Sequence, residues 1–288
     1  MENSSSITGI ILGNGFDLDL GWKTSYNDFF QAKKQDFYKL NGMPFIKNMI
    51  ESECWYDLEG YIRKITINEV TTENKVEELG YFWRLLTTKI EEYFRDDSIY
   101  ANNLNSCAFE FLNSIKDNSD IISFNYTNPF HICKLKPKGI KYIHNSIESA
   151  YSNEGEIKLG IDKGVLKENV FLKATDISYI IKSRENPIGD NLISKWEKYD
   201  NIIIFGHSLG ITDSDYFKPL FDSILSNNSH IHTLYIVTKD ETSLEVIKSN
   251  LFSYDIRYDS LLYSFNIVPI YATKGKNQQS FREMLQIL

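Results

Sequence analysis

The sequence contains few of the residues that hold small or secreted folds together. Only three of its 288 residues are cysteine, and they stand far apart, at Cys54, Cys107 and Cys133. An odd and scattered set of cysteines excludes both a disulfide framework and a zinc site with the usual ligand spacing. We therefore expect buried free thiols in a reducing compartment.

Long apolar runs are also absent. The apolar stretch near the N-terminus is short and is interrupted by Gly9 and Gly13, and no basic segment precedes it. This pattern is not that of a signal peptide. No run approaches the roughly 20 apolar residues that a membrane-spanning helix requires. These absences predict a cytoplasmic protein that makes no membrane contact.

The chain contains fewer basic than acidic residues. The chain has 31 lysine and arginine residues against 39 aspartate and glutamate residues, for a net charge of −8 at pH 7. This balance argues against nucleic acid as a partner, because a protein that wraps a phosphate backbone needs an excess of basic residues. Hydrophobic residues make up 42% of the chain, which is enough for a sizeable core. We expect a single domain over residues 1–288.

The first informative stretch is an apolar run at residues 7–12 that leads into the turn Gly13-Asn14-Gly15. One interpretation is a buried strand with a tight turn. The other is a phosphate site, formed by unobstructed backbone N–H groups at the start of a helix. Phe16 and Asp17 follow, and the Asp17 carboxylate would then hold ribose hydroxyls or cap a helix. The full dinucleotide fingerprint is not met, because Leu18 occupies its third glycine position.

Helical patterns dominate residues 25–118. Ser25 and Asp28 have the spacing of a capping box, and another helix is expected to start near Asp57. Between Lys75 and Phe94 the apolar residues recur at intervals of three and four, as on an amphipathic helix. The sequence therefore predicts a large helical insertion after the first strand, at about residues 25–118.

Strand patterns return in the second half of the chain. Apolar runs begin near Asp120, Gly139, Asn201, Thr233 and Phe265. Helices are expected at residues 241–250 and 278–288, and residues 168–198 are expected to be mainly helical. The alternation predicts an α/β, Rossmann-like fold with a mostly parallel sheet and helices on both faces.

Two polar residues stand where predicted strands end. Asn125 follows the apolar run that begins at Asp120, and His144 ends the next one. Ligands of α/β sheets bind at the carboxyl ends of the strands. An amide that both donates and accepts hydrogen bonds suits substrate positioning, and an imidazole suits a general base. The structural alternative is an asparagine that serves the turn before Pro129, with a histidine that is only packed.

Residues Gly206–Gly210 match the G-x-S-x-G nucleophile motif, between a predicted strand and a predicted helix. The motif indicates a serine esterase with Ser208 as nucleophile. The only later histidines, His230 and His232, flank the start of the next strand, which is not the place of a triad histidine. The alternative is a loop that lets backbone and the Ser208 hydroxyl approach a nucleotide, with Asp213 capping the next helix.

Four segments, taken in order, resemble the bacteriophage abortive infection AbiH family. They are Gly13–Asp17, Phe124–Thr127, Ile143-His144, and Phe205–Leu209 with Asp213. Trp55, Asp57, Leu58 and Glu59 also resemble the W-x-D-L-E element of that family. The likeness extends from about Ile10 to Phe217. Asn145 stands where the family usually has glycine, and since asparagine tolerates left-handed backbone, we expect the turn to be kept.

The same order of motifs is similar, more remotely, to the sirtuin-like NAD-binding fold. That resemblance implies catalytic roles for Asn125 and His144. It also implies that two glycine loops and their neighbours contact the nucleotide. This binding set is Gly13, Asn14, Gly15, Phe16, Asp17, Gly206, His207, Ser208 and Asp213. Thr127 stands where the sirtuin-like fold has an aspartate, which is a departure at the nicotinamide contact.

The resemblances favour an anti-phage protein that binds NAD or a related nucleotide and hydrolyses its nicotinamide–ribose bond. NAD is then the substrate or ligand, and neither a cofactor nor a metal is required. A second hypothesis is a nucleotide sensor without turnover, whose helical insertion contacts a phage-derived trigger or a defence-system partner. A third is the serine esterase. The sequence is compatible with a homo-oligomer.

Overall fold

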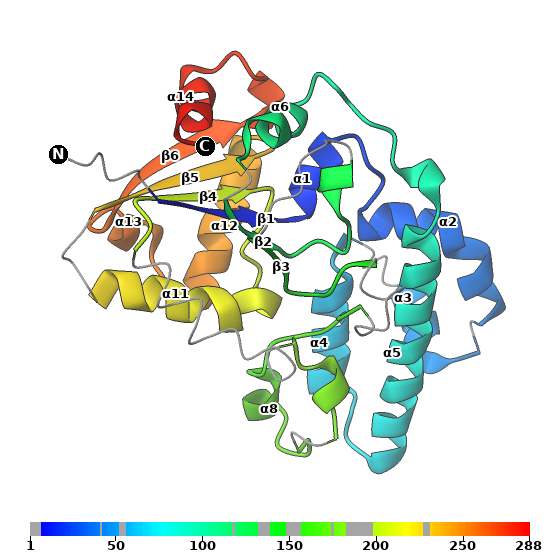
Figure 1. The fold of residues 1–288 in the computed structure, drawn as a ribbon. Coiled ribbons are helices and arrows are strands. Elements are labelled where there is room, and N and C mark those ends of the chain that lie inside the picture. Colours follow the sequence, from blue (N-terminus) through cyan, green and yellow to red (C-terminus); the bar gives the residue numbers. More distant parts are fainter. Residues whose placement is uncertain are drawn as a thin grey trace.

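Six parallel strands form one sheet in the computed structural model (Figure 1). The structure describes residues 7–40, 42–51, 56–116, 119–131, 139–147, 157–173, 176–182, 198–226 and 231–288. The strands are β1 (Thr8–Leu12), β2 (Asp120–Ser123), β3 (Gly139–Tyr142), β4 (Asn201–Phe205), β5 (His232–Thr238) and β6 (Phe265–Tyr271). Their order is β3-β2-β1-β4-β5-β6, and every neighbouring pair is parallel. The predicted Rossmann-like α/β fold is confirmed, and the strand order reverses between β1 and β4.

Helices cover both faces of the sheet (Figure 1). One face carries α1 (Asn14–Asp19), α6 (Cys107–Ser114) and α14 (Gln279–Ile287), and the other carries α11 (Ser214–Ser226), α12 (Glu241–Ser253) and α13 (Tyr258–Leu261). Leu12 of β1 packs into the first core and Ile11 into the second. Successive side chains of a strand point to opposite faces, so a strand covered on both sides is apolar at nearly every position.

A third core lies beside the sheet, in a layer of helices. This layer contains α2 (Tyr26–Lys39), α3 (Pro44–Glu51), α4 (Leu58–Asn68) and α5 (Glu73–Phe94), together with α8 (Val165–Glu168). Ser25 and Asp28 form the predicted capping box of α2, and the Asp57 side chain caps α4. The helices predicted from these caps and from the apolar pattern before Phe94 are confirmed. Short 3-10 turns are η2 (Asp97–Ile99), η3 (Pro129–His131), η4 (Ser178–Ile180), η5 (Ile211–Asp213) and η6 (Ala272–Lys274).

The prediction of a mainly helical segment from 168 to 198 is wrong for the part of it that the structure describes. Helix α8 ends at Glu168, and residues 169–173 and 176–182 contain only the turn η4 as a named element. Their backbone pairs with another segment, because the N–H of Ile161 donates to Ile180 O and the N–H of Lys182 donates to Ile161 O. Long-range pairing of this kind replaces the local bonds of a helix.

Some sequence expectations fall outside the described residues. Trp55, Cys54 and Cys133 are among them. Cys107 is buried and free, as expected. Among the helices that the structure describes, none has the length and apolar character needed to cross a membrane.

The two glycine turns that follow β1 and β4 contact each other directly. The N–H of Gly15 donates to Gly206 O at 2.8 Å, and the N–H of Gly13 donates to Phe205 O at 2.9 Å. Gly206 has a φ of 71°, and a Cβ there would lie 2.1 Å from the backbone nitrogen of Phe16. The glycines are therefore required by the contact between the turns.

We expect Gly206→Ala to lower the free energy of unfolding by about 3 kcal/mol, since it combines a left-handed backbone with a clash against rigid main chain. Gly210→Ala is the matched control, because a Cβ at Gly210 meets nothing closer than Ser208 Oγ at 3.6 Å. Urea unfolding of both variants measures the difference. Equal stabilities would show that the turn contact is not needed.

Candidate functional site

A cavity of about 690 Å³ opens at the carboxyl ends of β1, β2 and β4, beside the point where the strand order reverses. Its size is that of a small-molecule site. Most predicted site residues line it, namely Asn14, Gly15, Asp17, Asn125, His144, Gly206, His207, Ser208 and Asp213. Gly13 and Phe16 do not line it. Phe16 is buried in the core between α1, α6 and β4.

Asn125 lies two residues beyond β2 and is only 4% exposed. Its Nδ2 donates to Gly13 O at 3.1 Å and to Asp17 Oδ1 at 2.9 Å. These two bonds fix the orientation of the amide. Asn125 Oδ1 is buried and has no hydrogen-bond partner. A buried acceptor without a partner costs stability unless a ligand supplies the donor, and the side chain that carries this atom lines the cavity.

His144 lies two residues beyond β3 and is also 4% exposed. Its Nε2 is 3.5 Å from Asp213 Oδ1, while Nδ1 is buried and has no partner. Burial lowers the pKa of His144, with a further contribution from Lys182. The imidazole is therefore neutral near pH 7. With its N–H toward Asp213, it presents the Nδ1 lone pair as a proton acceptor.

A buried charge cluster lies beside His144 and His207, where both imidazole rings face Asp213. Lys182, only 2% exposed at its side chain, places Nζ 2.8 Å from Asp213 Oδ1 and 2.6 Å from Glu59 Oε2. Burial opposes its charge, but the two carboxylates raise the pKa of Lys182. Burial likewise opposes ionisation of Asp213, yet Lys182 and the histidines hold the Asp213 pKa well below its usual value. The cluster ties α4 to the loop after β4.

Sequence reasoning did not identify Lys182 or Glu59 as site residues. Glu59 belongs to the D-L-E segment that resembles the AbiH pattern, and it lines the cavity. Lys182 is 123 residues from Glu59 along the chain and carries no local signal. Tyr26 and Tyr126 also line the cavity; Tyr126 is buried and Tyr26 is partly buried.

Asp17 is the buried carboxyl group nearest to Asn125. It accepts hydrogen bonds from Asn125 Nδ2 and from the Thr127 hydroxyl. Burial raises the pKa of Asp17 from 3.8 to about 7, although both bonds oppose the rise. Asp17 therefore titrates near neutral pH in the folded protein.

This shift predicts a pH dependence of stability. A carboxyl whose pKa is raised in the folded state stabilises folding fully below pH 3.8, and that contribution is lost as pH rises toward 7. When the pH is raised from 5 to 8, the unfolding free energy of Asp17→Asn should increase by about 3 kcal/mol relative to that of the parent. Urea unfolding at both pH values measures this gain. In the control Asp240→Asn the pKa of the replaced group is lowered, so no gain is expected; the same pH dependence in the parent and in Asp17→Asn would contradict the assignment.

The chain matches the sequence model of a known protein family. The family model described as bacteriophage abortive infection AbiH matches residues 10–235. This chain belongs to the AbiH family. Family membership assigns it an abortive-infection role in defence against bacteriophage. No curated protein and no solved structure matches the chain.

The AbiH match begins in β1 and ends in β5, so it contains every candidate residue named above. Asn145, at the usual AbiH glycine position, has a φ of 57°. The expectation that asparagine keeps this left-handed turn is confirmed. Thr127 donates its hydroxyl to Asp17, and so it takes part in the site through that carboxyl.

Three N–H groups at the glycine turn after β1 are bonded within the protein, whereas the phosphate interpretation assumes free ones. The N–H groups of Gly13, Gly15 and Phe16 donate to protein carbonyls at 2.8–2.9 Å. The turn therefore shapes the cavity floor, and a phosphate would have to be bound by other groups.

The esterase hypothesis for Ser208 gains no support from the geometry. His207 Nδ1 accepts the N–H of Leu209 at 2.9 Å, and its Nε2 faces Asp213 Oδ2 at 3.5 Å. Both ring nitrogens are thus directed away from the serine. The left-handed residues of this loop are Gly206 and Leu209, whereas a nucleophile motif strains the serine itself.

Proposed function

We propose that this AbiH protein is a cytoplasmic NAD glycohydrolase, which cleaves the bond between nicotinamide and ribose during abortive infection. One observation carries the proposal. Asn125 Oδ1 and His144 Nδ1 are buried, lack partners, and belong to two side chains that line one cavity at the sheet's reversal point. A pair of unpaired acceptors suits a ribose and an attacking water, since both present hydroxyl donors.

The reaction needs little beyond positioning and one proton acceptor. As the bond from the ribose carbon to the nicotinamide nitrogen breaks, its electron pair neutralises the pyridinium, and nicotinamide leaves uncharged. The ribose develops oxocarbenium character, as in glycoside hydrolysis. Water forms the new carbon–oxygen bond and transfers a proton to His144 Nδ1, which then releases it to solvent. Asn125 Oδ1 orients the water or the ribose hydroxyl.

The charge around the cavity favours such a transition state. Glu59 and Asp213 both line it, and Lys182 is the cation between them. The two carboxylates and the one ammonium group together carry one negative charge in excess. A preorganised negative field stabilises a positively charged ribosyl group.

Product analysis tests the proposal. NAD is incubated with the purified full chain, and the mixture is separated by chromatography. The proposal predicts nicotinamide and ADP-ribose in equal amounts, formed in proportion to enzyme concentration. Ser208→Ala should retain the cleavage, since the serine has no nucleophilic role here. Absence of nicotinamide release from the parent would refute the hydrolase.

The pH dependence of the rate identifies the base. Because burial keeps the pKa of His144 below 6.5, kcat/KM should stay constant from pH 8 down to about 6.5 and fall only at lower pH. Asp17 titrates near 7. A decline that begins near pH 7 would instead assign the proton acceptor to Asp17. Steady-state nicotinamide release between pH 5 and 9 measures the profile.

A nucleotide sensor is the second candidate, and the walls of the cavity favour it. Glu59 from the helical layer and Asp213 from the loop after β4 face the same space. A bound nucleotide would bridge the two parts of the protein and alter the surface offered to a phage-derived trigger or a defence partner. Isothermal titration with NAD separates the candidates, because a sensor binds NAD and releases no nicotinamide.

A further inference from the structure

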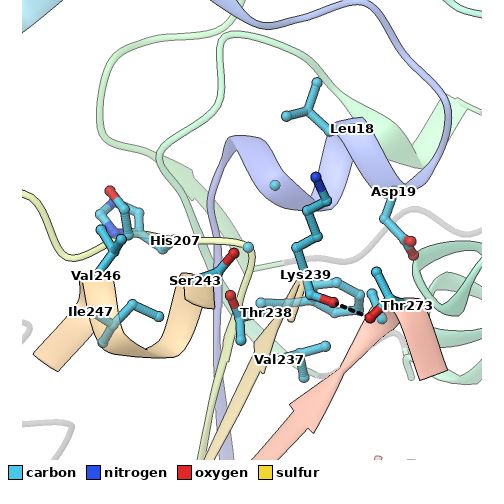
Figure 2. Close-up of a pocket in the computed structure, with 15 residues that line it drawn as sticks. Leu18, Asp19, His207, Val237, Thr238, Lys239, Ser243, Val246, Ile247 and Thr273 are labelled. Atoms are coloured by element: carbon cyan, nitrogen blue, oxygen red, sulfur yellow. Dashed lines mark hydrogen bonds between the residues drawn. The ribbon is translucent and has the colours of Figure 1, made fainter. Parts of the chain in front are cut away.

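A second cavity, of about 610 Å³, is also lined by both glycine turns, through Gly15 and Gly206. Figure 2 shows the side chains around it. It is formed at the carboxyl ends of β4, β5 and β6. Five residues line both cavities, namely Gly15, Gly206, His207, Ser208 and Val246. The two spaces are therefore adjacent, and Ser208 lies on the wall of both.

The second cavity combines an apolar lining with one cation. Leu18, Val237, Val246 and Ile247 contribute apolar surface, which suits a nucleobase. Lys239, directly after β5, is the lysine among the lining residues. Figure 2 shows its side chain extending from the strand end toward α1. Lys239 lies beyond residue 235, where the AbiH match ends.

The acidic groups near Lys239 are bound elsewhere. Glu241 pairs with Lys274 at 2.9 Å, and Asp19 accepts the N–H of Ala108 at 2.7 Å. Asp240 accepts the N–H of Ser243 as the cap of α12. Within the part of the chain that the structure describes, Lys239 forms no ion pair. It is thus an exposed cation at the cavity wall, which interacts electrostatically with the adjacent Asp240 but contacts no carboxylate of the described residues at ion-pair distance.

Hydroxyl groups surround the same wall. Thr238, Ser243 and Thr273 line the cavity with Lys239, and the Thr273 hydroxyl donates to Lys239 O at 2.9 Å. The Ser243 hydroxyl likewise donates to Asp240 Oδ1 at 2.9 Å. Lysine itself supplies a full charge and three N–H donors to a phosphate, and the Thr238 hydroxyl lies on the same wall.

We propose that the second cavity holds the adenosine half of the dinucleotide and that Lys239 selects a phosphate on its ribose. The substrate class is then the 2′-phosphorylated nicotinamide dinucleotide, in preference to NAD itself. This inference rests on the proposed function, because it names the substrate of that site. A 2′-phosphate adds about two negative charges beside a lysine that forms no ion pair with the described residues.

Adenosine fragments test the inference without turnover. Adenosine 2′,5′-bisphosphate and adenosine 5′-monophosphate are titrated by calorimetry into the full chain. The parent should bind the bisphosphate about tenfold more tightly, as expected for one charge-assisted contact. Lys239→Ala should bind both fragments alike, with unchanged affinity for the monophosphate. Lys274→Ala, which removes a neighbouring lysine already paired to Glu241, should keep the preference.

Three results would overturn the inference. They are equal binding of the two fragments by the parent, a preference that survives Lys239→Ala, and binding of neither fragment. The proposed hydrolase is tested separately, by nicotinamide release, because neither fragment contains the nicotinamide ribose that would occupy the first cavity. If the parent prefers the bisphosphate through Lys239 but cleaves no dinucleotide, the inferred phosphate specificity stands and the proposed hydrolase is refuted.

Discussion

Replacing Asn125 with alanine is expected to lower kcat for NAD hydrolysis about 1000-fold, while the Kd for NAD changes less than about tenfold. The substitution removes Oδ1, the buried acceptor without a partner, and with it the group that orients the reacting water. It also removes the Nδ2 bond that restrains Asp17. Single-turnover release of nicotinamide gives the rate of the chemical step, and calorimetry gives the affinity.

Asn128→Ala provides the matched control for Asn125. Asn128 follows on the same loop, accepts the N–H of Phe130 at 3.0 Å, and is not among the residues that line the cavity. Its removal should leave turnover within about twofold of the parent. A loss below about tenfold in Asn125→Ala would contradict the positioning role, as would an equal loss in both variants.

The second large effect concerns folding. Lys182→Met should lower the free energy of unfolding by about 4 kcal/mol at pH 8, because it leaves the carboxylates of Glu59 and Asp213 buried without their shared cation. Methionine keeps the volume of the side chain, so packing is retained. Urea unfolding measures the loss. The cost should shrink at pH 4.5, where protonation relieves the unpaired carboxylates.

Lys47→Met is the control for this measurement. Lys47 pairs with Glu51 at 3.8 Å on the surface, where both side chains are about 60% exposed. An exposed pair contributes less than about 1 kcal/mol, so the variant should unfold like the parent. Equal losses of unfolding free energy in Lys182→Met and Lys47→Met would show that burial of the charge cluster does not determine its contribution to stability.

Much of the sheet could be predicted from local pattern. The apolar runs at β1 and β4 are short and almost uninterrupted, which is typical of strands buried on both faces. Polar residues at the ends of such runs were candidates because parallel strands place their carboxyl ends at one edge. That reasoning placed Asn125 and His144 at strand ends, and the structure shows that both line one cavity.

Other features depend on contacts that no local pattern records. Lys182 meets Glu59 only because an irregular segment pairs with Ile161 and passes beside α4. The raised pKa of Asp17 comes from its burial, which outweighs the hydrogen bonds from Thr127 and Asn125 and is a property of the assembled site. The turn glycines suggested a phosphate site from the sequence. In the structure, Gly13 and Gly206 are required because the two turns are in contact and leave no room for a Cβ. Long-range packing decides each of these cases.

A crystal structure of the full chain with ADP-ribose bound would test the central claim most directly. We expect the ribose nearest the cleaved bond to lie in the first cavity, with hydroxyl oxygens about 2.7–3.2 Å from Asn125 Oδ1 and His144 Nδ1. The adenosine would lie in the second cavity beside Lys239. A ligand bound elsewhere, with Asn125 and His144 contacting only water or protein, would contradict the account.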